Sequence, residues 1–200
     1  DKSGTAADTG IESANGLRAI FLAGDSTVTD QENEPWASWG QMFPRFLKPE
    51  IAVCNYAESG ETLKAFRRAN RLAKIIGVMK PGDYLFIEFA HNDQKPGGNH
   101  LDPFTTYQEQ IRFYMNEARK KGGIPVLVTS TARRAFDENG KIKNTLLEYP
   151  DAMRQLAKEE NVALVDLNAM TKVLYETLGV ENSTHAFVHY PANTFPGQDK

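Results

Sequence analysis

The chain lacks most of the features that would indicate a metal, a cofactor or a membrane. It contains one cysteine, Cys54, which excludes an intrachain disulfide and a cysteine-based metal site. Its apolar stretches are too short to span a membrane, and neither the Gly-x-Gly-x-x-Gly nor the Walker pattern of nucleotide-binding proteins occurs. The net charge of -3 gives no support for a nucleic acid or an anionic membrane surface as partner. We therefore expect no cofactor, no nucleic acid and no membrane partner.

The composition that remains is that of one globular domain. Of the 200 residues, 40% are hydrophobic and 24% are charged, which is enough to bury a substantial core. Residues 1–16 are small and polar without periodicity, and we expect them to be a flexible lead-in that remains after signal removal or cloning. The folded domain is then expected over residues 17–200.

Apolar runs alternate with segments of helical period along this domain. Strands are expected in the apolar runs at residues 17–24, 51–56, 84–89, 124–130 and 162–166. One helical stripe is formed by Leu63, Phe66, Ala69, Ala73 and Ile76, and a second by Tyr107, Ile111, Tyr114, Met115 and Ala118. Further helices are expected near residues 149–159 and 168–178. Alternation of strand and helix favours a three-layer α/β sandwich on a parallel sheet.

The first apolar run ends abruptly in Gly24-Asp25-Ser26, which is typical of a tight turn from a strand into a helix. Such a turn places Ser26 at the carboxyl edge of the sheet, where ligands bind in open α/β folds. An exposed hydroxyl beside a free backbone N–H could act there as a nucleophile. Ser and Asp are also ordinary helix N-caps, and this alternative is favoured when the motif is taken alone.

Two later segments strengthen the case for a nucleophile. The run at 51–56 leads into Ala57-Glu58-Ser59-Gly60, and the run at 84–89 leads into Ala90-His91-Asn92-Asp93. If the strands are parallel, all three ends converge on one crevice. A serine hydroxyl would then meet the Gly60 N–H and the Asn92 amide, which are donors suited to the oxyanion of an acyl-transfer reaction.

These segments resemble the first three sequence blocks of the SGNH (GDSL-type) hydrolases. The heptapeptide that starts at Gly24, the loop at 36–40 and the segment at 89–94 are most similar to rhamnogalacturonan acetylesterase-like carbohydrate esterases and their bacterial relatives. The likeness runs from about Leu17 to the C-terminus. It implies the flavodoxin-like α/β/α sandwich with a five-stranded parallel sheet that is the SGNH hydrolase fold. It also implies Ser26 as nucleophile, with the N–H groups of Ser26 and Gly60 and the Asn92 side chain as the oxyanion hole.

The function implied by the resemblance is removal of acetyl groups from rhamnogalacturonan or a related plant cell-wall polysaccharide. The partner would be an acetylated polysaccharide or oligosaccharide, and the expected location is secreted or periplasmic. An alternative is a non-catalytic carbohydrate-binding relative. A flavodoxin-type binding or signalling domain would explain the sheet but not Asn92.

The chain departs from the family pattern in two places. Ala90 stands where the third block usually has glycine, and the fourth block, Asp-x-x-His with the catalytic Asp and His, does not occur. The nearest candidates are Asn182-Ser-Thr-His185 and His189. We expect the fourth block to lie beyond Lys200 together with the last helix, so that the domain is C-terminally incomplete and this chain inactive as it stands.

Other candidate binding residues lie in loops. Arg133 and Arg134, near Phe136, could bind a uronic acid carboxylate, because guanidinium offers a bidentate fork; the alternative is a solvated basic loop. Trp39, like Trp36, could line a carbohydrate subsite or pack in the core. The residues His91, Asp93 and His100 fit no standard zinc spacing, so we expect no metal site.

Overall fold

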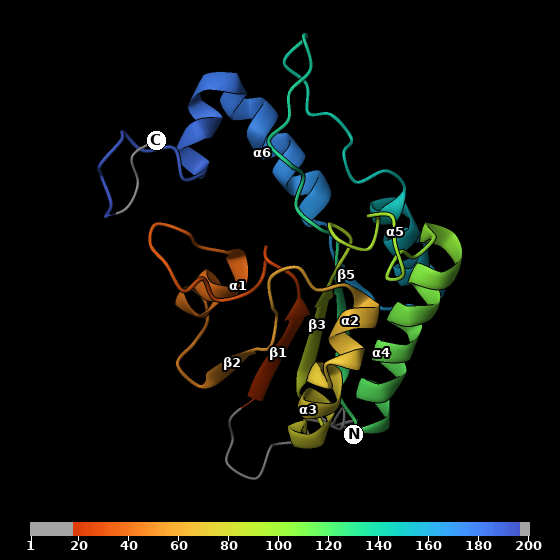
Figure 1. Ribbon diagram of the computed structural model, residues 1–200. Helices are drawn as coiled ribbons and strands as arrows, with labels where there is room; N and C mark the ends of the chain where they lie inside the picture. The colour runs from red at the N-terminus through yellow and green to blue at the C-terminus, as the bar shows by residue number, and fades with distance from the viewer. Residues whose placement is uncertain (1–17, 197–200) are drawn as a thin grey trace, which may run out of the picture.

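Five apolar segments form one parallel sheet in the computed structural model, which describes residues 18–196 (Figure 1). The strands are β1 (Arg18–Gly24), β2 (Ile51–Asn55), β3 (Tyr84–Glu88), β4 (Ile124–Val128) and β5 (Ala163–Val165). Their order is β2-β1-β3-β4-β5, and every neighbouring pair is parallel. The predicted five-stranded parallel sheet is confirmed. The predicted lead-in at residues 1–16 lies outside the described residues.

Helices connect successive strands, as a parallel sheet requires. They are α1 (Trp39–Met42), α2 (Leu63–Arg68), α3 (Arg71–Val78), α4 (Gln108–Lys120) and α5 (Tyr149–Glu159), and a further helix, α6 (Leu167–Asn182), follows β5. A 3₁₀ turn at Phe43–Phe46 follows α1, a π turn at Pro103–Tyr107 precedes α4, and a second 3₁₀ turn at Ser183–Ala186 follows α6. No helix within residues 18–196 has the length and apolar character needed to cross a membrane.

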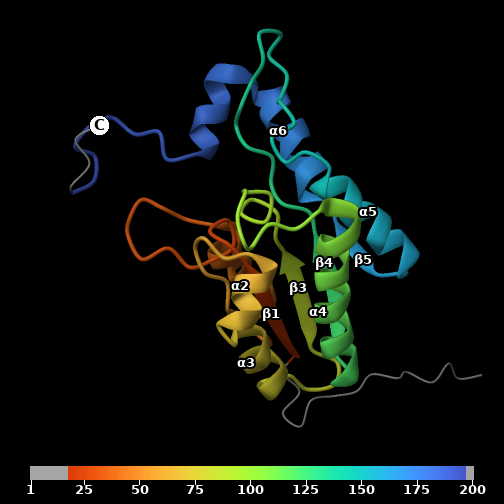
Figure 2. The same cartoon turned by 45° about the vertical axis from the view of Figure 1, so that its right-hand side comes forward.

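One face of the sheet is covered by α2, α3, α4 and α5, of which the first three stand together before the sheet in Figures 1 and 2. Alternate strand residues point to opposite faces, so Phe21 and Ala23 of β1 join this larger core. The predicted stripe on α4 is confirmed, since all five of its residues are buried. Its Tyr114 hydroxyl donates to the Leu63 carbonyl at 2.8 Å and so ties α4 to α2.

The stripe predicted from Leu63 to Ile76 is wrong at Ala69 and Ala73, although Ile76 packs against the core. The helix ends at Arg68, and Asn70 adopts the left-handed conformation with φ 58° before α3 begins. This break rotates the following helix, so Leu72 and Ile75 are buried while Ala69 and Ala73 are exposed. Periodicity across a break of this kind mixes two helix faces.

The other face has a thinner cover. Ile20 and Leu22 pack there with Val28 and with the aromatic residues of α1 and its 3₁₀ turn, while Phe86 of β3 is only partly buried. Helix α6 does not cover this face: it lies beyond the carboxyl ends of the strands (Figures 1 and 2). Its buried residue Tyr175 packs on the loop that follows β4. The predicted helix at 168–178 continues past a kink at Gly179 to Asn182.

Candidate active site

The site begins at the turn that follows β1. The Val28 and Thr29 N–H groups both donate to the Asp25 carbonyl at 3.0 Å, which closes a single turn around Ser26. The prediction of a helix starting here is wrong, because α1 begins only at Trp39. The chain leaves the turn toward β2 instead, held by the Thr29 hydroxyl, which donates to the Ala57 carbonyl at 2.9 Å.

Ser26 nevertheless occupies the predicted place. Its side chain is exposed at the carboxyl end of β1, and its N–H has no hydrogen-bond partner among residues 18–196. Gly24 makes this possible: a Cβ at that position would lie 2.5 Å from a Val28 methyl group and 3.0 Å from the Glu88 carbonyl. The close approach of the turn to β3 therefore requires glycine.

Beneath Ser26 lie three buried carboxyl groups, Asp25, Glu88 and Asp93, which together with the partly buried Thr27 we call the floor. The Thr27 hydroxyl is 3.0 Å from Asp25 Oδ1 and 2.8 Å from Glu88 Oε1. A hydroxyl has one hydrogen, so both contacts are hydrogen bonds only when one carboxyl group holds a proton and donates. Burial raises the pKa of Glu88 to about 8, with the nearby Asp25 adding to the effect, and burial also raises the pKa of Asp25.

Asn92 is fixed by the loops after β2 and β3. Its side-chain oxygen accepts from Lys95 Nζ at 2.7 Å, and its Nδ2 donates to the Glu61 carbonyl at 3.0 Å. An amide nitrogen carries two hydrogens, so one remains for a ligand. The adjacent Asp93 accepts from the Leu63 N–H at 2.9 Å, which holds the start of α2 against this loop. Burial raises the pKa of Asp93 to about 7.

Gly60 lies in the loop between β2 and α2 and has φ +82°, a conformation that glycine adopts without strain. The loop approaches β1 through Glu58, whose N–H donates to the Gly24 carbonyl at 3.2 Å. Gly60 itself is exposed and lies outside the wall of the crevice described next.

A crevice of about 370 Å³ opens at the carboxyl ends of β1, β3 and β4. Strand order 2-1-3-4-5 reverses direction between β1 and β3, which is where ligands bind in such sheets. The structure brings four of the predicted residues together in its wall, Ser26, Asn92, Arg133 and Arg134. The whole wall comprises Ser26, Thr27, His91, Asn92, Lys95, Thr131, Ala132, Arg133, Arg134 and Phe187.

The GDSL-like lipase/acylhydrolase family model matches residues 22–189. The chain belongs to this family. It is therefore a carboxylic ester hydrolase by family, and the predicted SGNH (GDSL-type) fold is confirmed.

Curated relatives are similar over most of the chain. Rhamnogalacturonan acetylesterase RhgT of Bacillus subtilis (strain 168) is 48% identical over 179 residues, which cover 88% of this chain and 76% of that protein. Probable rhamnogalacturonan acetylesterase YesY of the same organism is 39% identical over 81% of this chain and 76% of its own length. These matches confirm the resemblance to rhamnogalacturonan acetylesterases.

Among solved structures, protein YXIM_BACsu from Bacillus subtilis superposes with a TM-score of 0.79 at 28% sequence identity. The match covers 86% of this chain and 49% of that one, so the chain spans about half the length of the solved protein.

The cations that line this crevice are Lys95, Arg133 and Arg134, which we call the rim. Arg133 Nη1 donates to the Thr145 carbonyl at 2.9 Å, and Arg134 Nε donates to the Ser183 hydroxyl at 2.8 Å. The guanidinium of Arg134 also lies 5.7 Å from the centre of the Phe136 ring. Sequence reasoning missed Lys95, although a lysine three residues after Asn92 in a turn is placed to contact it.

Trp39 packs in the core and does not line the crevice. Its ring lies 5.8 Å from that of Phe43 in the smaller core, and its indole N–H donates to Glu88 Oε2. It thus supports the floor from below and is not part of the crevice wall. Trp36 is 55% exposed and lies outside that wall as well.

The imidazole in the crevice wall is that of His91, which the sequence suggested only as a doubtful metal ligand. It is 8% exposed, and its Nε2 is buried without a partner among residues 18–196. Burial, together with a smaller effect of the nearby Arg133 and Lys95 charges, lowers the pKa of His91 to about 4. General bases act best with a pKa near the working pH, so His91 is a poor base at neutral pH. His185 and His189 do not line the crevice, although Phe187 between them does.

No group of three or more His, Cys, Asp or Glu side chains suited to a metal ion occurs within residues 18–196. The crevice wall presents the Ser26 hydroxyl and the Asn92 amide to a ligand.

Proposed function

We propose that the protein is a serine esterase that removes acetyl groups from rhamnogalacturonan or a related plant cell-wall polysaccharide. The observation that carries this proposal is that Ser26 and Asn92 face one crevice rimmed by cations, in a chain similar to proteins named rhamnogalacturonan acetylesterases. A cationic rim suits a polymer that carries uronate groups. Because such a polymer is too large to cross a membrane, we also propose a secreted or periplasmic location.

In the proposed reaction the Ser26 hydroxyl oxygen attacks the carbonyl carbon of the acetyl group, and its proton passes to an imidazole base. The tetrahedral oxyanion accepts hydrogen bonds from the Ser26 N–H, the Gly60 N–H and Asn92 Nδ2. Collapse of this intermediate expels the sugar hydroxyl, which takes the proton from the imidazolium and leaves an acetyl group on Ser26. Water then attacks the acetyl-enzyme by the same route and releases acetate.

The floor and Lys95 support these steps by positioning the reacting groups. The Thr27 contacts hold the turn that carries Ser26, and the Lys95 contact fixes the side-chain oxygen of Asn92 so that its nitrogen is the free end. The base is the part that residues 1–200 do not supply in the family's form, since Asp-x-x-His is absent and His91 has a low pKa.

The test uses this chain extended after Lys200 by an Asp-x-x-His segment of the family, which we call the extended chain. We expect it to release acetate from acetylated rhamnogalacturonan and Ser26→Ala to abolish that release while leaving the circular dichroism spectrum unchanged. Ser59→Ala, which removes an exposed hydroxyl from the neighbouring loop, is the matched control and should retain activity.

Residual activity of Ser26→Ala close to that of the unmutated extended chain would contradict the proposed nucleophile. Binding of the polysaccharide without acetate release by a folded extended chain would favour a carbohydrate-binding protein instead.

A further inference from the structure

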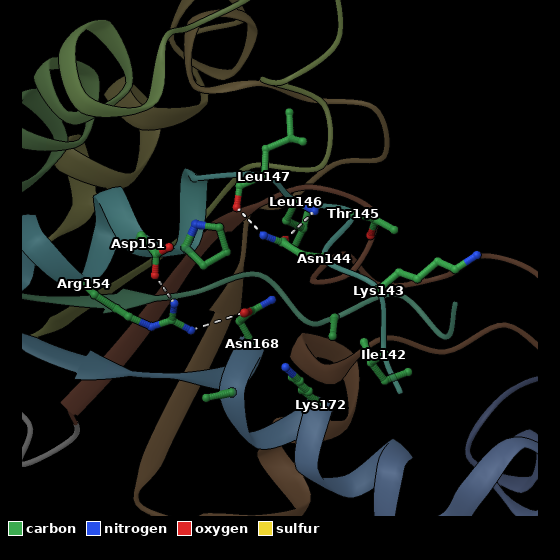
Figure 3. A pocket seen from close by; sticks show the side chains of 13 residues that line it. Ile142, Lys143, Asn144, Thr145, Leu146, Leu147, Asp151, Arg154, Asn168 and Lys172 are labelled. Atoms are coloured by element: carbon green, nitrogen blue, oxygen red, sulfur yellow. Dashed lines mark hydrogen bonds and ion pairs between the residues drawn. The ribbon is translucent and has the colours of Figure 1, made fainter. Parts of the chain in front are cut away.

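A second cavity, of about 320 Å³, lies on the far side of the loop that follows β4 (Figure 3). Its walls come from that loop, the first turns of α5 and the first turns of α6. The lining residues are Ala132, Ile142, Lys143, Asn144, Thr145, Leu146, Leu147, Pro150, Asp151, Arg154, Asn168, Ala169 and Lys172. Its volume is at the small end of the roughly 300–1,000 Å³ typical of ligand pockets, which suits a single sugar ring.

The lining carries more positive than negative charge. Arg154 is paired: it donates to Asp151 Oδ1 at 2.6 Å and to Asp166 Oδ2 at 2.8 Å. Lys143 and Lys172 form no ion pair within residues 18–196. Lys172 extends from α6 among the other lining side chains in Figure 3, whereas Lys143 points outward at the edge of the second cavity. The unpaired ammonium group of Lys172 therefore favours an anionic ligand.

The remaining lining suits a carbohydrate. The Asn168 side-chain oxygen accepts from Arg154 Nη2 at 3.2 Å, while its nitrogen donates to no group within residues 18–196. A ligand hydroxyl or carboxylate oxygen can accept from that nitrogen. Apolar wall is provided by Ile142, Leu146 and Pro150, against which the CH groups of a sugar ring can pack.

The cavity also adjoins the Ser26 crevice. Ala132 lines both, and Arg133 of the crevice rim donates to the carbonyl of Thr145 in the cavity wall. The segment at 131–134 is thus a partition between two ligand-sized spaces. A polymer with one unit at Ser26 would carry a nearby unit past this partition.

We propose that the second cavity binds a carboxylate-bearing sugar unit of the polysaccharide, with Lys172 contacting the carboxylate and Asn168 a neighbouring oxygen. This inference rests on the proposed function, because the ligand class is that of the proposed substrate. It adds a specificity determinant that lies away from the reacting ester.

The test measures binding of a short galacturonate oligomer and of its methyl ester to the 200-residue chain by calorimetry. We expect Lys172→Glu to weaken binding of the acid oligomer about tenfold or more, the usual effect of losing a hydrogen bond to a charged group. Binding of the neutral ester should change less than about twofold, since it lacks the carboxylate. Lys172→Gln, which removes only the charge, should weaken binding of the acid in the same direction by a smaller factor.

Lys74→Glu is the matched control, because it makes the same charge change at an exposed lysine of α3 outside the cavity. It should leave both affinities unchanged. Equal weakening by Lys74→Glu would mean a general effect of net charge and would overturn the proposal. Failure of the unmutated chain to bind the acid oligomer, or unchanged binding by both Lys172 variants, would overturn it as well.

Binding is measured without turnover, so the two proposals fail separately. Loss of acid binding in Lys172→Glu with no acetate release by the extended chain would refute the proposed esterase function and support the proposed binding site in the second cavity. Acetate release by the extended chain with unchanged binding in Lys172→Glu would refute the proposed binding site and support the proposed esterase function.

Discussion

The floor and the rim of the Ser26 crevice are built in opposite ways. The carboxyl groups of the floor are buried, burial raises their pKa values, and the Thr27 contact joins the turn after β1 to β3. The rim consists of cations on loops, each tied to the chain by hydrogen bonds and open to solvent on one side. A buried network cannot shift without leaving polar groups unpaired, whereas exposed cations can. We infer that the floor sets the position of the reacting groups and that the rim selects the substrate.

The largest expected effect concerns the base, which belongs to neither region. The 200-residue chain should hydrolyse p-nitrophenyl acetate near the background rate, because an isolated serine at neutral pH is a poor nucleophile. The extended chain should be faster by several orders of magnitude. Weak turnover by the unextended chain is compatible with this, since an oxyanion hole alone leaves some catalysis.

Full activity of the unextended chain would contradict this expectation. It would mean that His91, His185 or His189 serves as base, and alanine substitution of each in turn would identify which.

Asn92→Ala tests whether the amide that Lys95 and the Glu61 carbonyl position is an oxyanion donor. In the extended chain kcat should fall by about two to three orders of magnitude, the usual effect of losing one such donor. KM should change little, because the interaction strengthens only in the transition state. Asn99→Ala, in the exposed loop nearby, is the control. An unchanged rate would give Asn92 a structural role only.

Glu88→Gln tests the buried, proton-holding character of the floor. The pKa of Glu88 in the folded protein, about 8, is above the ordinary value of 4.5, so the folded state binds its proton more tightly than the unfolded state. The free energy of unfolding should therefore fall as the pH rises from about 5 to 8, by up to about 1.4 kcal/mol per pH unit from this group. Urea denaturation at several pH values measures this slope.

Glu88→Gln should flatten the slope, because the amide stays neutral, and the raised pKa values of Asp25 and Asp93 should leave a remainder of the same sign. The exposed Glu50→Gln is the control and should leave the slope unchanged. Parallel curves for Glu88→Gln and the unmutated chain would mean that Glu88 holds no extra proton in the folded state.

The smallest expected effect is on the rim. Arg133→Ala and Arg134→Ala in the extended chain should raise KM for an acidic polysaccharide by about three- to tenfold, as expected for an exposed charge contact. The rate on a small neutral acetate ester should be retained, because that ester has no carboxylate for the arginines to bind. On the acidic polysaccharide the contact between arginine and carboxylate is equal in the ground and transition states, so it affects KM and not kcat. Equal losses of activity on both substrates would contradict the inference that the rim selects the substrate.

Local sequence patterns predicted much of the fold. The strand positions follow from apolar runs, and the bounds predicted for α5 agree with Tyr149–Glu159 because its apolar residues keep one helical period throughout. The helical period did not predict the break at Asn70, which separates α2 from α3. The turn after β1 did not continue as a helix, because the Thr29 hydroxyl bonds to the loop after β2. For the site, a lone carboxylate inside the apolar run of β3 was the available signal for Glu88.

The motif residues Ser26 and Asn92 could be placed from the sequence because each directly follows a strand, and parallel strands bring such ends to one edge whatever the details of packing. Other features depend on contacts between distant parts of the chain. Trp39 meets Glu88 across 49 positions and Thr27 meets it across 61, and the second cavity needs α5, α6 and one loop to converge. Such contacts are set by how faces pack against one another, and no local pattern encodes them, so they emerged only from the folded arrangement.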